Sequence, residues 1–243
     1  MRIIDAICVI GDVGHGGAEP PLLLEEMRRN DVQRAVLVPD DLMTAVDNEE
    51  GNRFVLCAIE QNPDAFLGFA VANPWFGKRA EKWLRSALDA GLCGVYFKST
   101  VQGFLADDEL LNPLLEICRE RSVPVYFHTG TPVHALPFGV LSQARRFPEV
   151  NFILGHMGAN DYVGDAFAAV NLCDNVYLET SFNLTTLIRS AVELRPERVI
   201  FGSGSPRSNM SFELKKVFEA VPNEERRALL LHTNFERLLG GRV

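Results

Sequence analysis

The chain has 243 residues, a formal net charge of -8 at pH 7 and 47% hydrophobic residues. This length suits one α/β barrel or one open α/β sheet with a substantial core. The negative charge argues against a nucleic-acid or anionic-membrane surface, because both need clustered cations, so we expect a small-molecule or protein partner.

Eight short apolar runs rich in β-branched and aromatic residues predict buried strands. They cover residues 3–9, 34–38, 67–72, 94–97, 123–127, 151–154, 176–178 and 199–201. Segments with helical periodicity lie between them, for example residues 22–28, 80–90, 110–121, 140–147, 167–173 and 187–194. This alternation is typical of βαβ units around a parallel sheet.

The predicted strands begin at intervals of roughly 23 to 33 residues, close to the length of one βα unit. Eight such units predict an eight-stranded parallel (β/α)8 TIM barrel. Two extra C-terminal helices, at residues 212–221 and 224–239, are expected to close its last face. An open doubly wound sheet is the alternative, and pairing between the first and eighth strands distinguishes the two. Since no linker interrupts the sequence, we expect one domain over residues 1–243.

The sequence also predicts a cytoplasmic location. The five cysteines contain no Cys-x-x-Cys pair and are expected to be reduced thiols, mostly in the core. The first residues lack the apolar run of a signal peptide, and no stretch reaches the roughly 18 apolar residues of a membrane span.

Polar side chains follow the predicted strands at their carboxyl ends, where parallel α/β folds carry their chemistry. They are Asp40, Asn73, Lys98, His128, His156, Glu179, Ser203 and Arg207. Their convergence on one rim predicts a functional site. Each residue also has a simpler interpretation. Either histidine could be a core residue hydrogen-bonded to a backbone carbonyl, and Arg207 could be a solvated side chain. Lys98 could serve merely as the ion-pair partner of Glu179. Glycines beside His156 indicate a close backbone approach.

Two loops at this edge are expected to carry specificity. The glycines of loop 11–20 could cradle a phosphate, but their spacing matches neither the P-loop nor the dinucleotide-binding fingerprint, so a lid or a connector is favoured. Loop 131–138 contains apolar residues, and Phe138 could contribute to a homo-oligomer surface.

Several motifs resemble those of the amidohydrolase superfamily, in the branch that includes aminocarboxymuconate-semialdehyde decarboxylase and pyrone-dicarboxylate lactonase. They are Ile3-Ile4-Asp5-Ala6, Phe127-His128-Thr129-Gly130, Leu154-Gly155-His156-Met157-Gly158, the segment 198–203 and the C-terminal segment 234–240. The resemblance implies a TIM barrel with a divalent metal, usually zinc. It also implies the metal ligands: a His-x-His pair on strand one, the histidine ending strand five and an aspartate ending strand eight. The histidine ending strand six would serve the chemistry.

This chain departs from that ligand set. The His-x-His pair falls at Ile7 and Val9, and the aspartate falls at Gly204, so only His128 remains. Cys8 is no substitute, because alternate residues of a strand face opposite sides. Catalytic zinc is normally held by at least three protein ligands. We therefore predict no metal and no other cofactor.

The first functional hypothesis is a metal-independent hydrolase, lactonase-like or esterase-like, or a decarboxylase, acting on a small carboxylated metabolite. His156 would be the general base or acid and His128 its hydrogen-bond partner, while Lys98, beside an apolar wall, could act as an acid near neutral pH. Lys98 and Arg207 would supply the positive charge that the metal gives. The predicted substrate-binding residues are Glu179, Ser203, Arg207 and Asn73.

The second hypothesis is a catalytically inactive amidohydrolase-like pseudo-enzyme that binds a metabolite or a protein partner. A dry, closed pocket in which both histidines face each other would favour the enzyme. Histidines packed into the core would favour the pseudo-enzyme.

Overall fold

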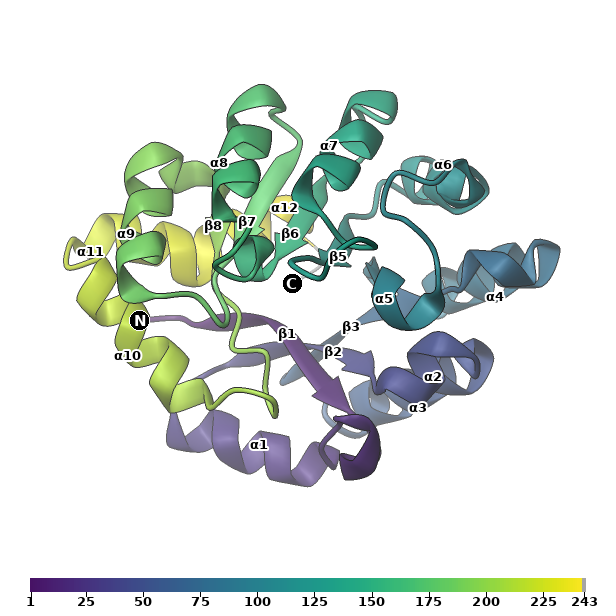
Figure 1. Ribbon diagram of the computed structural model, residues 1–243. Coiled ribbons are helices and arrows are strands. Elements are labelled where there is room, and N and C mark those ends of the chain that lie inside the picture. The colour runs from purple at the N-terminus through teal and green to yellow at the C-terminus, as the bar shows by residue number, and fades with distance from the viewer. Residues whose placement is uncertain (242–243) are drawn as a thin grey trace.

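Eight parallel strands form one sheet in sequence order, in a computed structural model that describes residues 1–241 (Figure 1). The strands are β1 (Ile4–Ile10), β2 (Arg34–Pro39), β3 (Phe66–Val71), β4 (Gly94–Phe97), β5 (Val125–His128), β6 (Phe152–Gly155), β7 (Val176–Glu179) and β8 (Val199–Ile200). All eight predicted strands are therefore confirmed, with ends that shift by one or two residues.

Helices surround this sheet and follow each strand (Figure 1). They are α1 (Pro20–Arg29), α2 (Asp41–Ala45), α3 (Asn48–Gln61), α4 (Lys78–Asp89), α5 (Ser99–Gln102), α6 (Asn112–Arg121), α7 (Pro137–Arg146), α8 (Val163–Leu172), α9 (Thr185–Leu194), α10 (Met210–Ala220), α11 (Glu224–Ala228) and α12 (Asn234–Leu238). Within residues 1–241, no helix is long and apolar enough to cross a membrane.

The sheet closes on itself through the segment that follows β8. The Ala6 amide donates to the Phe201 carbonyl at 3.0 Å, and the Val9 amide donates to the Ser205 carbonyl at 2.8 Å. Between them, the Gly204 amide donates to the Ile7 carbonyl at 3.1 Å. The TIM barrel is thus confirmed, and the open doubly wound sheet is excluded.

The core has two layers, as the alternation of side chains along a strand requires. Ile7 and Val9 belong to the cluster inside the barrel, whereas Cys8 belongs to the cluster between the sheet and the helices. Cys8 therefore faces away from the barrel interior, as predicted.

The last helix, α12, fills the amino-terminal end of the barrel and does not add to its outer face. Phe235 of α12 lies in the interior cluster, with its ring centroid 6.4 Å from that of Phe69. The Asn234 side chain donates to the carbonyls of Pro196 and Val199, both at 2.8 Å, at the start of β8. The expectation that residues 224–239 cover the last face holds in part. Leu230 and Leu231 lie with α10 in the cluster outside the sheet, whereas Phe235, Leu238 and Leu239 pack inside the ring.

A buried carboxyl group sits at the closure. One Asp5 oxygen accepts the Ser203 amide at 2.8 Å and the Ile7 amide at 3.2 Å. The other oxygen has no hydrogen-bond partner among the described residues, and the side chain is fully buried. Burial raises the pKa of Asp5 from 3.8 to about 7, although its hydrogen bonds oppose this shift.

This shift predicts a pH-dependent cost that Asp5→Asn removes. Between the unfolded pKa of 3.8 and the folded pKa of about 7, the folded protein holds a proton that the unfolded chain has lost. The free energy of unfolding therefore falls as the pH rises through this window. Denaturant titrations of Asp5→Asn should show a shallower fall than those of wild type. Asp107→Asn, at an exposed position, should keep the wild-type slope, and equal slopes in all three proteins would contradict the prediction.

Candidate functional site

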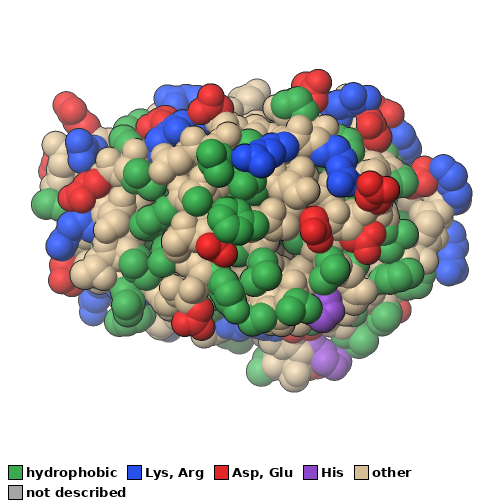
Figure 2. Space-filling model, turned by 45° about the horizontal axis from the view of Figure 1, so that its top comes forward, with side chains coloured by type: hydrophobic (Ala, Val, Ile, Leu, Met, Phe, Trp, Pro, Cys, Tyr) green, Lys and Arg blue, Asp and Glu red, His purple; other side chains and the backbone are tan. Residues whose placement is uncertain are grey.

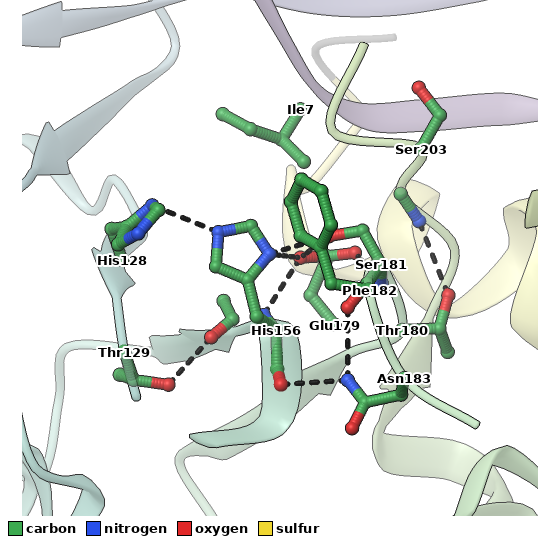
Figure 3. A network of polar contacts seen from close by, with 12 residues as sticks. Ile7, His128, Thr129, His156, Glu179, Thr180, Ser181, Phe182, Asn183 and Ser203 are labelled. Carbon is green, nitrogen blue, oxygen red and sulfur yellow. Dashed lines mark hydrogen bonds and ion pairs between the residues drawn. The ribbon is translucent and has the colours of Figure 1, made fainter. Parts of the chain in front are cut away.

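Three strand ends bring a glutamate and two histidines into one hydrogen-bonded chain (Figure 3). His128 ends β5, His156 follows β6 directly, and Glu179 ends β7. His156 Nε2 lies 2.9 Å from His128 Nδ1, and His156 Nδ1 lies 2.6 Å from Ser181 Oγ. Ser181 in turn donates its hydroxyl proton to Glu179 Oε2 at 2.9 Å. The chain therefore runs Glu179–Ser181–His156–His128.

The Glu179 carboxylate is fully buried, yet four donors surround it. Besides the Ser181 hydroxyl, Oε2 accepts the Tyr126 hydroxyl at 2.7 Å and the His156 amide at 3.0 Å. Oε1 accepts the Ser181 amide. Burial raises the pKa of Glu179, and these hydrogen bonds act in the opposite direction. With every neighbour donating, the ionised form matches its surroundings.

An ionised Glu179 fixes the direction of every proton in the chain. Because the Ser181 hydroxyl donates to Glu179, its oxygen must accept from His156 Nδ1–H. His156 Nε2 is then a bare lone pair that accepts from His128 Nδ1–H. This tautomer assignment, which follows from the network, leaves a lone pair on His128 Nε2.

Both imidazoles are held in the neutral form. Burial, with smaller effects from Lys98 and Arg207, lowers the pKa of His156 from 6.5 to about 3. Burial, then the neighbouring His156, Lys98 and Arg207 lower the pKa of His128 well below its usual value. Neutral imidazoles at pH 7 can accept protons, which suits a general base.

His156 reaches this position through an unusual turn. Its φ is 64°, and Met157, Gly158, Ala159 and Asn160 also have positive φ values. The left-handed conformation costs roughly 1–2 kcal/mol of conformational energy for each residue that has a side chain. The Asn183 side chain donates to the His156 carbonyl at 2.7 Å and holds the turn.

The close backbone approach predicted beside His156 is made by a tyrosine. A Cβ on Gly155 would lie 2.3 Å from the Tyr126 hydroxyl, which explains why glycine precedes this histidine.

A narrow cavity lies over the two histidines at the barrel mouth. Its lining residues are Ile7, Val9, Tyr96, Lys98, His128, His156, Phe182, Gly204 and Arg207. The space open to the centre of a water molecule is about 10 Å³, which is room for roughly one water. The mouth is thus nearly filled by side chains, and its two histidines face each other.

Phe182 packs against Gly204, the position at which the motif resemblance implies an aspartate. The Phe182 and His156 rings meet edge to face, with centroids 4.8 Å apart. A Cβ on Gly204 would lie 2.7 Å from the Phe182 ring, and Gly204 has a φ of 68°. An aspartate at 204 would therefore collide with this ring, so Phe182 and Gly204 fit each other and exclude the carboxylate.

The donor set at the mouth does not fit a divalent metal. Ile7, Val9 and Phe182 present carbon where ligands would be needed, and the two imidazoles already bond to each other. Glu179 is saturated by donors. Within the described residues, no three His, Cys, Asp or Glu side chains are grouped to hold an ion.

An ion-pair bridge joins two cations that line the cavity, Lys98 and Arg207. Lys98 Nζ lies 2.6 Å from Asp41 Oδ1, and the Arg207 guanidinium donates to Asp41 Oδ2. Lys98 therefore pairs with Asp41 and not with Glu179. Burial lowers the pKa of Lys98, while Asp41 opposes this shift.

The remaining predicted side chains lie away from the cavity. Asn73 donates to the Ala45 carbonyl at 2.7 Å, and Ser203 Oγ accepts the Ser205 amide at 3.1 Å. Asp40 caps α2 by accepting the Met43 amide at 3.0 Å. These side chains shape the backbone around the site and do not line it.

Six residues that the sequence analysis did not select contribute to the site: Asp41, Tyr96, Tyr126, Ser181, Phe182 and Asn183. Three of them stand in Thr180-Ser181-Phe182-Asn183, directly after Glu179. Their place after a predicted strand was the available signal. Asp41 stands beside Asp40, and the sequence does not reveal which of the two faces the mouth.

Glu179→Gln is predicted to destabilise the protein by at least about 2 kcal/mol, because its amide group presents protons to buried donors. Chemical denaturation measures this loss. Glu60→Gln makes the same change at an exposed site and should stay within about 0.5 kcal/mol of wild type. A similar small effect at Glu179 would contradict the described network.

Solved structures with this fold include enzymes that act on aromatic acids. A 5-carboxyvanillate decarboxylase from Sphingomonas paucimobilis superposes with a TM-score of 0.81 at 16% identity, covering 98% of this chain and 99% of that chain. A 2,6-dihydroxybenzoate decarboxylase from Rhizobium gives 0.80 at 18% identity, with 99% of both chains covered. A TIM-barrel protein from Bordetella bronchiseptica gives 0.74 at 21% identity, covering 100% and 99%. At these identities the likeness shows the fold.

Comparison with curated proteins gives no match. The sequence model of the amidohydrolase family, however, matches residues 10–241, nearly the whole chain. The motif resemblance is therefore confirmed, and the chain belongs to the amidohydrolase family of TIM-barrel proteins.

Proposed function

We propose that this protein is a metal-independent hydrolase, lactonase-like or esterase-like, that acts on a small carboxylated metabolite. The observation that carries the proposal is the polarised chain Glu179–Ser181–His156–His128, which ends in a neutral imidazole at the cavity. A buried anion coupled to a neutral base is what general-base activation of water requires.

The geometry favours His128 as the base and His156 as the positioning residue. Both ring nitrogens of His156 are engaged, one by Ser181 and one by His128. His128 Nε2 is the nitrogen left to meet a water molecule in the cavity. This reverses the two roles expected from the family motif.

In the proposed reaction, a water molecule gives a proton to His128 Nε2 while its oxygen attacks the acyl carbon. His128 passes its Nδ1 proton to His156, His156 passes its Nδ1 proton to Ser181, and the Ser181 proton reaches Glu179. Because burial already raises the pKa of Glu179, this carboxylate accepts a proton readily. Lys98 and Arg207 stabilise negative charge on the substrate, and the proton returns through His128 to the leaving oxygen.

Decarboxylation is the variant of this proposal that the related structures favour. Two of them are aromatic-acid decarboxylases by name. A third similar structure, a 5-carboxyvanillate decarboxylase from Novosphingobium aromaticivorans, was solved with manganese and a nitrobenzoic acid. Without a metal, carbon protonation in this chain would depend on Lys98, whose pKa is lowered by burial. The neutral histidines are better suited to take a proton than to give one, so we place hydrolysis first.

A binding protein without turnover is the second candidate. The mouth admits about one water molecule, and its walls are largely apolar, which would suit capture of a ligand after a small opening. Substrate binding without any product in the assays below would favour it.

A homo-oligomer stays a prediction. Hydrophobic side chains gather among charged ones on one face of the molecule (Figure 2). Phe138 at the start of α7 and Leu172 at the end of α8 are exposed and line one surface groove.

Substitution of His128 tests the proposal. Ring opening of small carboxylated lactones and CO2 release from hydroxybenzoates would be followed with protein dialysed against a chelator. Activity should persist after dialysis, and His128→Gln should lose at least about 100-fold in kcat/KM, as loss of a general base does. Metal analysis of the same samples should find no stoichiometric metal.

His232→Gln, in the C-terminal helices, is the matched control and should keep wild-type activity. Ser181→Ala interrupts the chain without touching the cavity and should give an intermediate loss. Full activity in His128→Gln, or recovery only on adding zinc or manganese, would overturn the proposal.

The pH profile of kcat/KM should have an acid limb below pH 6.5, the ordinary pKa of histidine. A base must be unprotonated, so activity falls as the pH drops through its pKa, and this pKa is lowered by burial and neighbouring cations. Arg207→Gln removes one of these cations and should move the limb to higher pH. An acid limb at or above the ordinary value in wild type would contradict the assignment.

A further inference from the structure

The mouth contains a position built for an anion between two cations. Lys98 approaches it from the end of β4, with a side chain that is only 7% exposed. Arg207 approaches it from the segment after β8, with a side chain that is 34% exposed. Both cations also line the cavity over the histidines. Any carboxylate placed between them would border the site of the proposed reaction.

A carboxylate of the chain itself occupies this position. Asp41 gives one oxygen to Lys98 and the other to Arg207, so it contacts both cations as a carboxylated ligand would. Its side chain is 31% exposed, which leaves it a path to water that the Lys98 amine lacks.

The helix that carries Asp41 is firmly held. Asp40 caps α2 and also accepts the Asp12 amide at 2.9 Å. The carbonyls of Thr44 and Ala45 accept the side chains of Gln102 and Asn73, at 3.3 and 2.7 Å. Asp41 therefore leaves the two cations by rotating its side chain, and the backbone need not move.

We propose that Asp41 is a specificity-determining residue: it competes with the substrate carboxylate for Lys98 and Arg207, and a ligand enters the mouth by replacing it. The inference rests on the proposed function for the identity of the ligand class. The bridge from Lys98 through Asp41 to Arg207 joins two cations that line the cavity, so a carboxylate that binds both of them must take the place of Asp41.

If a ligand carboxylate replaces Asp41, its affinity depends on a difference: the ion pairs that it forms with Lys98 and Arg207, less the ion pairs that Asp41 gives up. A ligand carboxylate gains charge-assisted hydrogen bonds from both cations, but the bonds of Asp41 must first be given up. A neutral ligand of the same shape gains no such bonds, so it binds through apolar contacts and does not displace Asp41. The wild-type protein should therefore bind carboxylates weakly and select the anion over its neutral analogue only modestly.

The test compares Asp41→Asn with wild type in calorimetric titrations with benzoate and with benzamide, its neutral analogue. Asp41→Asn should bind benzoate at least about tenfold more tightly, because an amide holds the two cations less strongly than a carboxylate, while benzamide binding stays unchanged. The double variant Asp41→Asn/Arg207→Gln should lose the gain.

Asp47→Asn is the matched control. It lies six positions further along, in an exposed site, and makes the same change in net charge. It should bind benzoate as wild type does. An equal gain in both variants, an equal gain for benzamide, or no benzoate binding by Asp41→Asn would overturn the proposal.

A second measurement covers the case in which Asp41→Asn does not fold. A crystal structure of the wild-type protein with benzoate should show the benzoate carboxylate on Lys98 and Arg207, with Asp41 turned to solvent. Benzoate elsewhere, with the Asp41 bridge intact, would overturn the inference. Tighter benzoate binding by Asp41→Asn without turnover of any substrate would refute the hydrolase and leave the Asp41 inference standing. Turnover without tighter benzoate binding would refute the Asp41 inference and leave the hydrolase standing.

Discussion

The site depends on one buried negative charge. Glu179 lies inside the barrel with no access to water, and an isolated carboxylate there would be too costly to keep ionised. Four donors make it tolerable, and three of them belong to residues that define the site: the backbone amide of His156, and the hydroxyl and backbone amide of Ser181. The same bonds that stabilise the charge therefore set the position of His156 and the tautomer of both histidines. Removing the charge would alter the geometry and the proton order together.

The space around the two histidines is filled by local packing. Ile7 and Val9 turn the strand-one face into an apolar wall, and the Phe182 ring fills the space that Gly204 leaves open. The two cations at the mouth, Lys98 and Arg207, come from other strand ends, and both pair with Asp41. The mouth is consequently a packed arrangement of apolar and ion-paired side chains.

Most of the fold could be predicted from the sequence. Buried parallel strands are recognised in the sequence as apolar runs such as residues 123–127. The histidines at the ends of these runs could be placed at the barrel mouth, because the carboxyl ends of the strands converge there. Within the site, the proximity of His128 and His156 followed from adjacent strands. The partner of Lys98 could not be predicted, because loop conformation decides which of two adjacent carboxylates, Asp40 or Asp41, faces inward. The left-handed turn after β6 could not be predicted either. Glycine is the usual signal for positive φ values, and only one of the five residues 156–160 is a glycine. Helix α12 was placed on the wrong side, because its amphipathic pattern does not tell whether a helix packs outside or plugs an end.

The seam of the barrel joins Asp5 to Ser203, 198 positions later in the chain. Contacts of such long range form slowly, because the intervening chain must be ordered before they are gained. Until the ring shuts, β1 and β8 are two unprotected edges able to pair with other chains. Since the carboxyl at the seam is buried most easily with its proton, mildly acidic conditions would favour ring closure over association between half-formed barrels.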